Sequence, residues 1–338
     1  MIKDILDRLI RGVELSAEEA ESVMEEIISG QLTPAQIAGF LVSLRMKGES
    51  AEEILGCARA MRSKMINLPY QGEETIDTCG TGGDHTGTFN VSTTVAFVLA
   101  GAGEKVAKHG NRSVSSRCGS ADVLEHLGVK IELKPENSAK VLQKTGIAFL
   151  YAPIFHPALR YAGEVRKDLE LRTVFNILGP LANPAGVAYQ VLGVYDPRLT
   201  EKMAKALKEM GCKAALVVSG GDGLDELSNT GRNIITELKN GKIVNYSLEP
   251  EEVGLERKTL AELQGGDARE NARIVRGILE GEQGAKREIV LLNAGAGLYL
   301  RGRVESIAAG IKLAAESIDR GLALKKLEEF GRETRKLN

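Results

Sequence analysis

The chain has 338 residues, a formal net charge of −2 at pH 7 and four cysteines without CxxC or metal-type spacing. This length predicts two domains or one large one, and the balanced charge gives no global electrostatic reason to expect nucleic-acid binding. Neither a signal-peptide pattern nor an apolar run long enough to span a membrane is present. Together with the cysteine spacing, this predicts a soluble protein of the cytoplasm.

Residues 1–70 are predicted to form a small, wholly helical domain. After the first helix, three more each begin with a capping box, in which a hydroxyl and a later side chain satisfy each other's free backbone N–H groups. The three pairs are Ser16 with Glu19, Thr33 with Gln36, and Ser50 with Glu53. Residues 67–74 (NLPYQGEE) indicate the first linker.

From residue 75 the pattern changes to alternating strands and helices. Strands are predicted at 75–79, 105–108, 129–133, 147–151, 189–195, 214–219, 233–238, 242–247 and 287–292. Helices are predicted at 92–102, 120–127, 136–145, 198–210, 268–280, 304–320 and 322–336. The alternation predicts a larger α/β domain over residues 71–338, with a mainly parallel central sheet and ligands at the carboxyl ends of its strands. Asn240-Gly241 indicates a β-hairpin over 233–247.

Residues 155–184 form an insertion that is long for a simple crossover between strands. We expect it to bridge to the helical domain. It contains His156, Arg166 and Pro180. Taken alone, a single histidine is more often structural than catalytic, and an arginine in a mixed-charge run usually faces solvent.

The first candidate site is the loop that follows the predicted strand 75–79. Glycines at 80, 82, 83 and 87 precede an apolar helix, and such a loop is a natural anion site because backbone N–H groups can approach the ligand. A P-loop is excluded because no lysine is present, and a dinucleotide fingerprint because His85 replaces its third glycine. Asp84 would need a cation beside phosphates, or it binds a sugar hydroxyl or holds the loop's own shape. A glycine-rich turn without a ligand remains an alternative.

The second candidate site is residues 108–122, again between a strand and a helix. Lys108, Arg112 and Arg117 bring positive charge, and four serines bring short donors. This mixture suits a pyrophosphate, which needs many donors and neutralisation of its charge as it leaves. The alternative is a solvated loop that happens to be basic.

The third candidate site is the adjacent carboxylate pair Asp225 and Glu226, near the end of the predicted strand 214–219. Mg²⁺ binds one or two carboxylates together with waters and substrate phosphates. A solvated acidic turn is the alternative. We expect the pair in a turn that faces the Gly80 loop. The run Asn293 to Gly297 follows a predicted strand, indicates close helix–strand packing and is assigned no chemistry.

Taken together, these segments resemble the anthranilate phosphoribosyltransferase family, within the superfamily that includes nucleoside phosphorylases. The matching stretches lie between residues 80 and 226, and the length and helical N-terminus fit the whole chain. They are Gly80 to Asp84, Thr88 to Thr93, Lys108 to Arg112, Gly119 to Gly128, His156 to Ala158, Val165 to Lys167, Arg172 to Pro184, and Asp225-Glu226. A departure is His85, where many members have glycine.

The resemblance implies an activity: transfer of the phosphoribosyl group of 5-phosphoribosyl 1-diphosphate (PRPP) to the amino group of anthranilate, with release of pyrophosphate, in tryptophan biosynthesis. It also implies a homodimer that uses two Mg²⁺ ions per monomer. By position, the implied PRPP site comprises Gly80, Gly83, Asp84, Thr88, Asn90, Val91, Ser92, Thr93, Lys108, His109, Gly110, Asn111, Arg112, Ser113, Val114, Ser115, Ser116 and Ser120. The implied anthranilate site comprises Gly80, His109, Asn111, His156, Arg166 and Pro180, and the implied metal ligands are Ser92, Asp225 and Glu226.

This chemistry needs positioning and charge neutralisation rather than a protein nucleophile, because C1 of the ribose develops oxocarbenium character as pyrophosphate leaves. We therefore expect no catalytic nucleophile, and electrostatic stabilisation by Lys108, Asp225 and Glu226. Two alternatives stay open: a pyrimidine nucleoside phosphorylase, and a nucleic-acid-binding relative without transferase activity. The Lys108 to Arg112 stretch and the carboxylate pair favour the transferase over the first, and the balanced charge disfavours the second.

Overall fold

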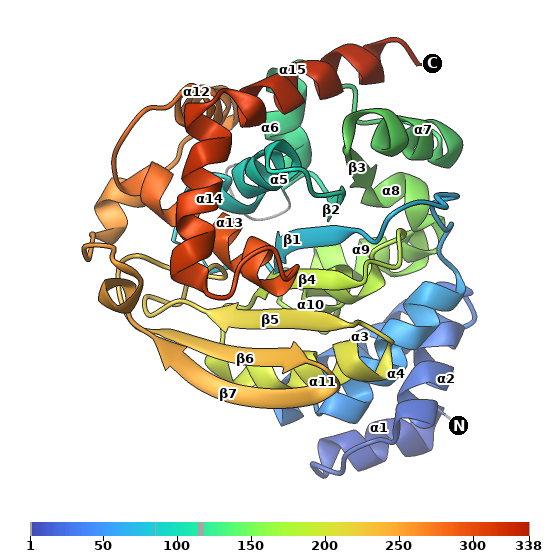
Figure 1. Cartoon of the computed structure of the whole chain (residues 1–338). Helices are drawn as coiled ribbons and strands as arrows, with labels where there is room; N and C mark the ends of the chain where they lie inside the picture. Colours follow the sequence, from blue (N-terminus) through green and yellow to red (C-terminus); the bar gives the residue numbers. More distant parts are fainter. Residues whose placement is uncertain (1, 85, 114–117, 338) are drawn as a thin grey trace.

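The computed structural model describes residues 2–84, 86–113 and 118–337. Its centre is a seven-stranded sheet with the order β3-β2-β1-β4-β5-β6-β7 (Figure 1). Strands β1 to β5 pair in parallel, and β6 and β7 add an antiparallel edge. The strands are β1 (Ile76–Gly80), β2 (Val106–Gly110), β3 (Ile147–Tyr151), β4 (Tyr189–Gly193), β5 (Ala214–Ser219), β6 (Asn233–Lys239) and β7 (Lys242–Leu248). The expected mainly parallel sheet and the β6–β7 hairpin are confirmed.

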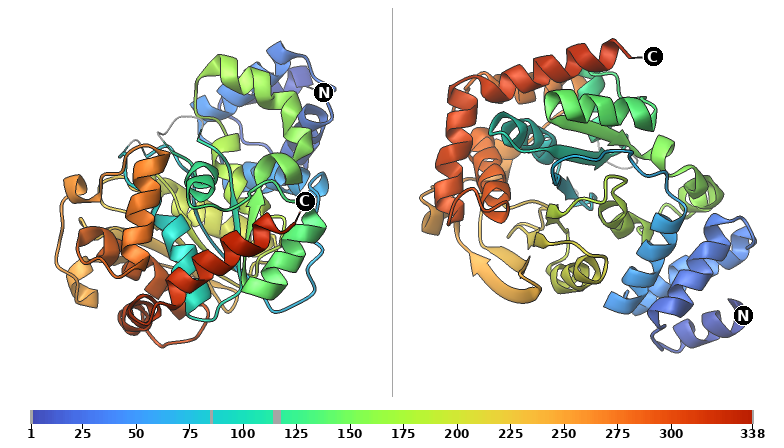
Figure 2. Two further views of the ribbon diagram at one scale, coloured as in Figure 1. Left: turned by 90° about the horizontal axis from the view of Figure 1, so that it is seen from above. Right: turned by 45° about the vertical axis from the view of Figure 1, so that its right-hand side comes forward.

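Helices cover both faces of this sheet (Figures 1 and 2). On one face α5 and α13 contact the strands, and α14 and α15 pack on them; on the other face α11 contacts β5 and β6. These helices are α5 (Val91–Gly101), α6 (Ser120–His126), α7 (Pro135–Thr145), α8 (Ala152–Phe155), α11 (Thr200–Glu209), α12 (Ala268–Leu279), α13 (Ala285–Leu300), α14 (Ile307–Asp319) and α15 (Leu322–Arg335). Short 3₁₀ helices are η1 (Pro157–Leu159), η2 (Gly179–Ala182), η3 (Pro197–Leu199), η4 (Pro250–Val253) and η5 (Leu260–Leu263).

The N-terminal part is a bundle of four helices, as predicted. All three expected capping boxes are present, and Pro34 occupies the first turn of its helix. Two helices of the 155–184 segment pack on this bundle: α9 contacts α2 and α3, and α10 contacts α4. The bounds are α1 (Ile2–Ile10), α2 (Ala17–Ile28), α3 (Pro34–Lys47), α4 (Ala51–Ser63), α9 (Arg160–Leu169) and α10 (Phe175–Leu178). The division of the chain at residue 70 into two domains stays a prediction.

The predicted strand at 129–133 is wrong. Val129, Ile131 and Leu133 are buried in the core, so the alternating pattern does mark a buried, half-extended segment. It joins no ladder because its neighbour is a helix: the N–H of Lys130 donates to the hydroxyl of Thr334 on α15. Side-chain packing accounts for the alternation that resembled a sheet edge.

The predicted strand at 287–292 is also wrong, because these residues lie within α13. This helix is buried nearly all round, and a short apolar run cannot distinguish a buried strand from a buried helix. The close packing predicted here is therefore helix on helix: a Cβ on Gly295 would lie 2.6 Å from the N atom of Ile311 on α14. No helix in the described residues is both long and apolar enough to cross a membrane.

Candidate active site

Loops from three parallel strands gather at their carboxyl ends. The loop after β5 lies directly on the ends of β1 and β4. A Cβ on Gly80 would lie 2.0 Å from a carboxylate oxygen of Asp225, and a Cβ on Gly193 would lie 1.5 Å from its carbonyl oxygen. Gly80 and Gly193 are register partners between β1 and β4. Two neighbouring strands therefore end in glycine at one level, which makes room for the third loop.

Asp225 and Glu226 lie in the loop after β5, against the glycine-rich loop. The N–H of Gly82 donates to Oδ2 of Asp225 at 2.6 Å, and the N–H of Ser92 donates to Oε1 of Glu226 at 3.1 Å. Ser92 is in the first turn of α5, where free N–H groups and the helix dipole favour negative charge. The glycine-rich loop thus holds one of the two adjacent carboxylates, and the start of the helix that follows it holds the other.

The carboxylates at this position resist ionisation. Burial raises the pKa of Asp225, and the nearby Asp84 raises it further. Burial also raises the pKa of Glu226, with Asp225 as the next cause. Asp84 accepts hydrogen bonds from the N–H and hydroxyl of Thr86, at 3.2 and 2.6 Å, so it also holds the shape of its own loop. A proton or a cation between these groups relieves their repulsion.

Lys108 lies on β2 and connects it to β1 and to the start of α5. Its buried ammonium donates to the carbonyl oxygen of Thr78 at 2.6 Å and to the hydroxyl of Ser92 at 3.1 Å. Because Ser92 also donates its N–H to Glu226, the cation, the hydroxyl and the carboxylate form one connected group. The structure therefore brings together three of the predicted site residues from three separate strands' ends.

This donor set fits Mg²⁺, which prefers hard oxygen ligands and retains waters and substrate oxygens. Across residues 2–84, 86–113 and 118–337, no three His, Cys, Asp or Glu side chains gather as a ready metal site. A cation here would therefore depend on Asp225, Glu226, the Ser92 hydroxyl and oxygens supplied by a ligand.

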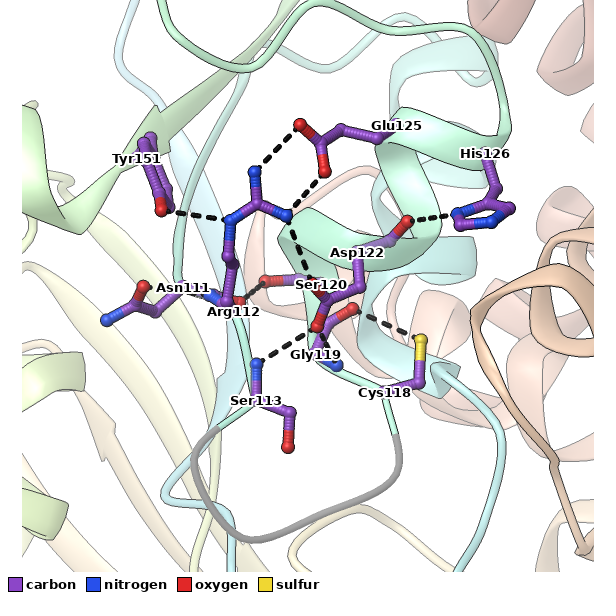
Figure 3. A network of polar contacts seen from close by, with 10 residues as sticks. All are labelled: Asn111, Arg112, Ser113, Cys118, Gly119, Ser120, Asp122, Glu125, His126 and Tyr151. Carbon is purple, nitrogen blue, oxygen red and sulfur yellow. Dashed lines mark hydrogen bonds and ion pairs between the residues drawn. The ribbon is translucent and has the colours of Figure 1, made fainter.

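Arg112, predicted to bind PRPP, is held by acidic partners on α6 (Figure 3). Its guanidinium forms two hydrogen bonds with Glu125, at 2.5 and 2.8 Å, and contacts Asp122 at 3.3 Å and the Tyr151 hydroxyl at 3.2 Å. Asp122 also accepts the N–H groups of Ser113 and Gly119, which brings the two ends of the basic loop together. Arg112 would have to exchange acidic partners for phosphate oxygens.

The other residues predicted to line the PRPP site lie in several different environments. Val114, Ser115 and Ser116 lie outside the described residues. The hydroxyl of Ser120 donates to the carbonyl oxygen of Asn111 at 3.3 Å, close to Gly110. The side chains of Val91 and Thr93 are buried in the core, so only their backbone at the start of α5 can face a ligand. Thr88 pairs with Gln264 in an isolated bridge.

His109 and His156 form a pair with ring centroids 5.0 Å apart; His156 is buried, and so are the Nε2 atoms of both rings. Burial lowers the pKa of His109 to about 3 and that of His156 to about 4, so both rings are neutral at pH 7. Nδ1 of His109 lies 3.1 Å from the carbonyl oxygen of Gly179, which precedes Pro180. Neither Nε2 atom has a hydrogen-bond partner in the described part of the chain. The pair therefore presents two uncharged aromatic rings, and each ring has one nitrogen that could still form a hydrogen bond.

Arg166 lies apart from this pair, on α9 beside the helical bundle. Its guanidinium carbon is 4.9 Å from the ring centroid of Phe175, and burial lowers its pKa. Asn111 uses its side-chain oxygen to accept the N–H of Arg112 at 2.8 Å. Arg166 therefore lies on the insertion and Asn111 on the loop after β2, and their shared role at an acceptor site stays a prediction.

Three residues that support the site were missed from the sequence. Asn293 clamps Leu227, next to Glu226: it accepts the N–H of Leu227 at 3.0 Å and donates to its carbonyl oxygen at 2.7 Å. Gln264 donates to the carbonyl oxygen of Thr86 at 2.8 Å. Asn271 donates at 3.0 Å to Asn90, which in turn donates to the carbonyl oxygen of Cys118. An amide inside an apolar helix was the available signal for Asn293, because a buried amide needs partners.

Comparison with known proteins places this geometry in a family. Residues 3–65 match the glycosyl transferase family, helical bundle domain, and residues 72–324 match the glycosyl transferase family, a/b domain. The chain is 52% identical over 328 residues to anthranilate phosphoribosyltransferase of Brevibacillus brevis, covering 97% of this chain and 96% of that protein. It belongs to the anthranilate phosphoribosyltransferase family.

Solved structures agree over the whole length. The crystal structure of anthranilate phosphoribosyltransferase from Thermus thermophilus is similar with a TM-score of 0.92 and 44% identity, covering 98% of this chain and 99% of that one. The Saccharomyces cerevisiae enzyme in complex with PRPP and Mg is similar with a TM-score of 0.91 and 29% identity, covering 99% and 98%. The same yeast enzyme is also known in complex with 4-fluoroanthranilate, at a TM-score of 0.89, 29% identity and coverage of 99% and 98%.

Proposed function

We propose that this chain transfers the phosphoribosyl group of PRPP to the amino group of anthranilate, giving N-(5-phosphoribosyl)anthranilate and pyrophosphate, in tryptophan biosynthesis. The observation that carries the proposal is the connected group of Lys108, Ser92 and Glu226 at the meeting point of three strand-end loops. Membership of the anthranilate phosphoribosyltransferase family supports it. Within this group the cation and the helix start can bind a diphosphate directly, and the carboxylate can do so through Mg²⁺.

The donor substrate occupies the two loops after β1 and β2. Backbone N–H groups at Gly80, Gly83 and the start of α5 face its phosphates, together with donor groups of Thr88, Asn90, Ser120 and the stretch from Lys108 to Ser113. Asp84 contributes through a cation or a sugar hydroxyl. Ser92, Asp225 and Glu226 hold two Mg²⁺ ions, which neutralise the charge of the leaving diphosphate when bound. Lys108 adds a fixed positive charge from a buried position, where electrostatic interactions are stronger than in water.

The acceptor lies between the insertion and the loop after β2. Arg166 and Asn111 bind the carboxylate of anthranilate, and an arginine fork can bind it at two points. Gly80, Pro180 and the pair His109–His156 border the path of its ring. Because both imidazoles are neutral at pH 7, they present aromatic faces without competing for the carboxylate.

No residue acts as a nucleophile in this scheme. The amine of anthranilate forms a bond to C1 of the ribose as the bond from C1 to the pyrophosphate oxygen breaks, and the developing positive charge is on the sugar. The proton that the nitrogen loses passes to the released pyrophosphate or to solvent. The protein's contribution is to hold donor and acceptor in line, since placement replaces a bimolecular encounter with an intramolecular one.

We further propose that the chain acts as a homodimer of two-domain subunits divided at residue 70, with residues 155–184 bridging to the helical domain. Exposed apolar side chains on the bundle support the dimer: Ile10 is 74% and Met46 83% exposed. The contacts of α9 and α10 with the bundle support the bridging role. Sedimentation at several concentrations tests the dimer.

One assay tests the activity. With PRPP and Mg²⁺, the fluorescence of anthranilate should fall as the product forms, and each substrate should be required. Thymidine phosphorolysis and a DNA mobility shift, measured on the same preparation, test the two alternatives. Phosphorolysis or a DNA shift without loss of anthranilate fluorescence would contradict the proposal.

A further inference from the structure

Arg172 is half-buried, and one nitrogen of its guanidinium has no partner among the described residues. It lies between α9 and α10, and its Nη2 atom is buried without a hydrogen-bond partner in the described residues. Two other arginines differ: the buried Arg287 pairs with Asp319 at 2.7 Å, and the half-buried Arg62 donates to the carbonyl oxygens of Leu181 and Met210. A buried donor normally has a partner, so an unpartnered cationic nitrogen indicates a missing anion.

Two contacts fix the position of the Arg172 guanidinium. Its central carbon lies 4.2 Å from the ring centroid of Tyr195, which follows β4. The Tyr195 hydroxyl in turn accepts a hydrogen bond at 3.1 Å from Arg45 on α3. Arg172 is therefore supported on one side by a ring that is itself held by the helical bundle.

The other side of the guanidinium lies against the glycine-rich loop. A Cβ on Gly83 would lie 1.9 Å from Nη2 and 2.3 Å from the central carbon of Arg172. Gly83 also has φ of +75°, which favours glycine. The absence of a side chain at residue 83 therefore lets an arginine from the insertion reach the backbone of the loop after β1.

Asp84 follows Gly83 in the chain, but both of its carboxylate oxygens already accept hydrogen bonds. It accepts from the N–H and the hydroxyl of Thr86, and no ion pair joins it to Arg172 among the described residues. Gly82, the residue before Gly83, donates its N–H to Asp225, so Gly83 adjoins the contact between the glycine-rich loop and the carboxylate pair. Arg166, by contrast, stacks on Phe175 within the insertion.

We propose that Arg172 is a further substrate-binding residue, which donates to a phosphate oxygen of the diphosphate group of PRPP and of the pyrophosphate product. This inference rests on the proposed function for the identity of the anion. It gives the insertion a direct part in donor binding, in addition to the acceptor role of Arg166. The diphosphate is then bound by cations from two sides: Lys108 from the sheet and Arg172 from the insertion.

The test compares binding of inorganic pyrophosphate with Mg²⁺ to the wild-type protein and to Arg172→Gln by calorimetry. A charged hydrogen bond corresponds to a loss of roughly tenfold to hundredfold in affinity. The KM for PRPP should rise by a similar factor, with the KM for anthranilate nearly unchanged. Arg172→Lys should recover part of the affinity because it keeps the charge. Arg198→Gln is the matched control, since Arg198 is exposed and pairs only with Asp196 among the described residues.

Two results would overturn the proposal. The first is unchanged pyrophosphate affinity in Arg172→Gln. The second is an equal loss toward both substrates with a lower melting temperature and no recovery in Arg172→Lys, which would make Arg172 a support for the loop. If the wild type bound pyrophosphate but left anthranilate unchanged, the proposed function would fail at the acceptor, and the pyrophosphate comparison would still decide the role of Arg172.

Discussion

The helical bundle and the strand-end loops satisfy their polar groups at very different distances along the chain. In the bundle, Ser16 and Glu19 cap one another across three residues. In the site, Gly82 and Asp225 are 143 residues apart, and Ser92 and Glu226 are 134 apart. The structure of the bundle therefore depends on contacts between residues that are close in the sequence. The site, by contrast, forms only when the whole sheet is assembled. Stability in the first and activity in the second should respond separately to mutation.

The largest expected effect separates activity from stability within the site. Asp225→Asn with Glu226→Gln keeps the shape and the acceptor atoms that bind Gly82 and Ser92, but removes the charges that hold Mg²⁺. We expect kcat to fall by orders of magnitude. The free energy of unfolding without substrate should not fall, because repulsion among buried acids is relieved. Steady-state kinetics and urea unfolding measure the two quantities.

A variant with near-normal turnover at limiting Mg²⁺ would contradict this prediction and leave the pair as an ordinary acidic turn. The single variants are the matched controls, because each keeps one carboxylate. Each should retain more activity than the double variant.

The same difference in sequence separation between contacting residues decides how much of the fold and of the site could be predicted from the sequence. The capping boxes and the glycine-rich loop are short patterns, and both were found where predicted. The strand at 287–292 was not, because its apolar run fits a buried helix equally well. Asn293 directly follows that run, so the predicted strand end also hid its contact with Leu227. The partners of Arg172 and Gln264 depend on which loops meet, and no short window contains that information.

Asn293 offers a way to affect both properties together. Asn293→Ala leaves the N–H and carbonyl group of Leu227 without these partners, and a buried unsatisfied group costs about 1–3 kcal/mol. We expect the free energy of unfolding to fall by about 2–4 kcal/mol, and kcat to fall because Glu226 is no longer held in place. Urea unfolding and steady-state kinetics on one preparation measure both.

Asn229→Ala is the comparison for this variant. Asn229 is also buried and donates to the carbonyl oxygen of Ala285, but it lies further from Glu226 along the loop. We expect Asn229→Ala to lose stability but to show a smaller loss of kcat than Asn293→Ala. Equal kinetic losses in the two variants would show that Asn293 acts through general stability alone.

The pH dependence of stability sharpens the same contrast. Because the folded state raises the pKa of Asp225 and Glu226, it binds their protons more tightly than the unfolded chain. Their contribution to stability is therefore greatest at low pH and is lost as the pH rises from about 4, the ordinary carboxylate range, through the raised values. His109 and His156 act in the opposite direction, since their lowered pKa values favour the folded state as the pH rises toward 6.5.

The difference in stability between the wild type and the double variant isolates the contribution of the two carboxylates. Unfolding is measured from pH 5 to 9 without metal for the wild type and for the double variant Asp225→Asn/Glu226→Gln, so that the histidine contribution cancels. The wild type should lose stability relative to the variant as the pH rises. Parallel curves would mean that the two acids ionise as they do in the unfolded chain.

The smallest expected effect lies in the bundle and should leave the site untouched. Thr33 caps α3: its hydroxyl accepts the N–H of Gln36 at 3.4 Å, and the Gln36 side chain accepts the N–H of Thr33 at 2.9 Å. Thr33→Ala removes one side of this box and should lower the free energy of unfolding by about 1 kcal/mol, whereas Thr33→Ser should restore it. Both substrates' KM values and kcat should stay at the wild-type level, because none of the cap's partners reaches the strand-end loops. A kinetic change in Thr33→Ala would mean that the bundle transmits local loosening to the site, and the separation between local stability and long-range function would fail.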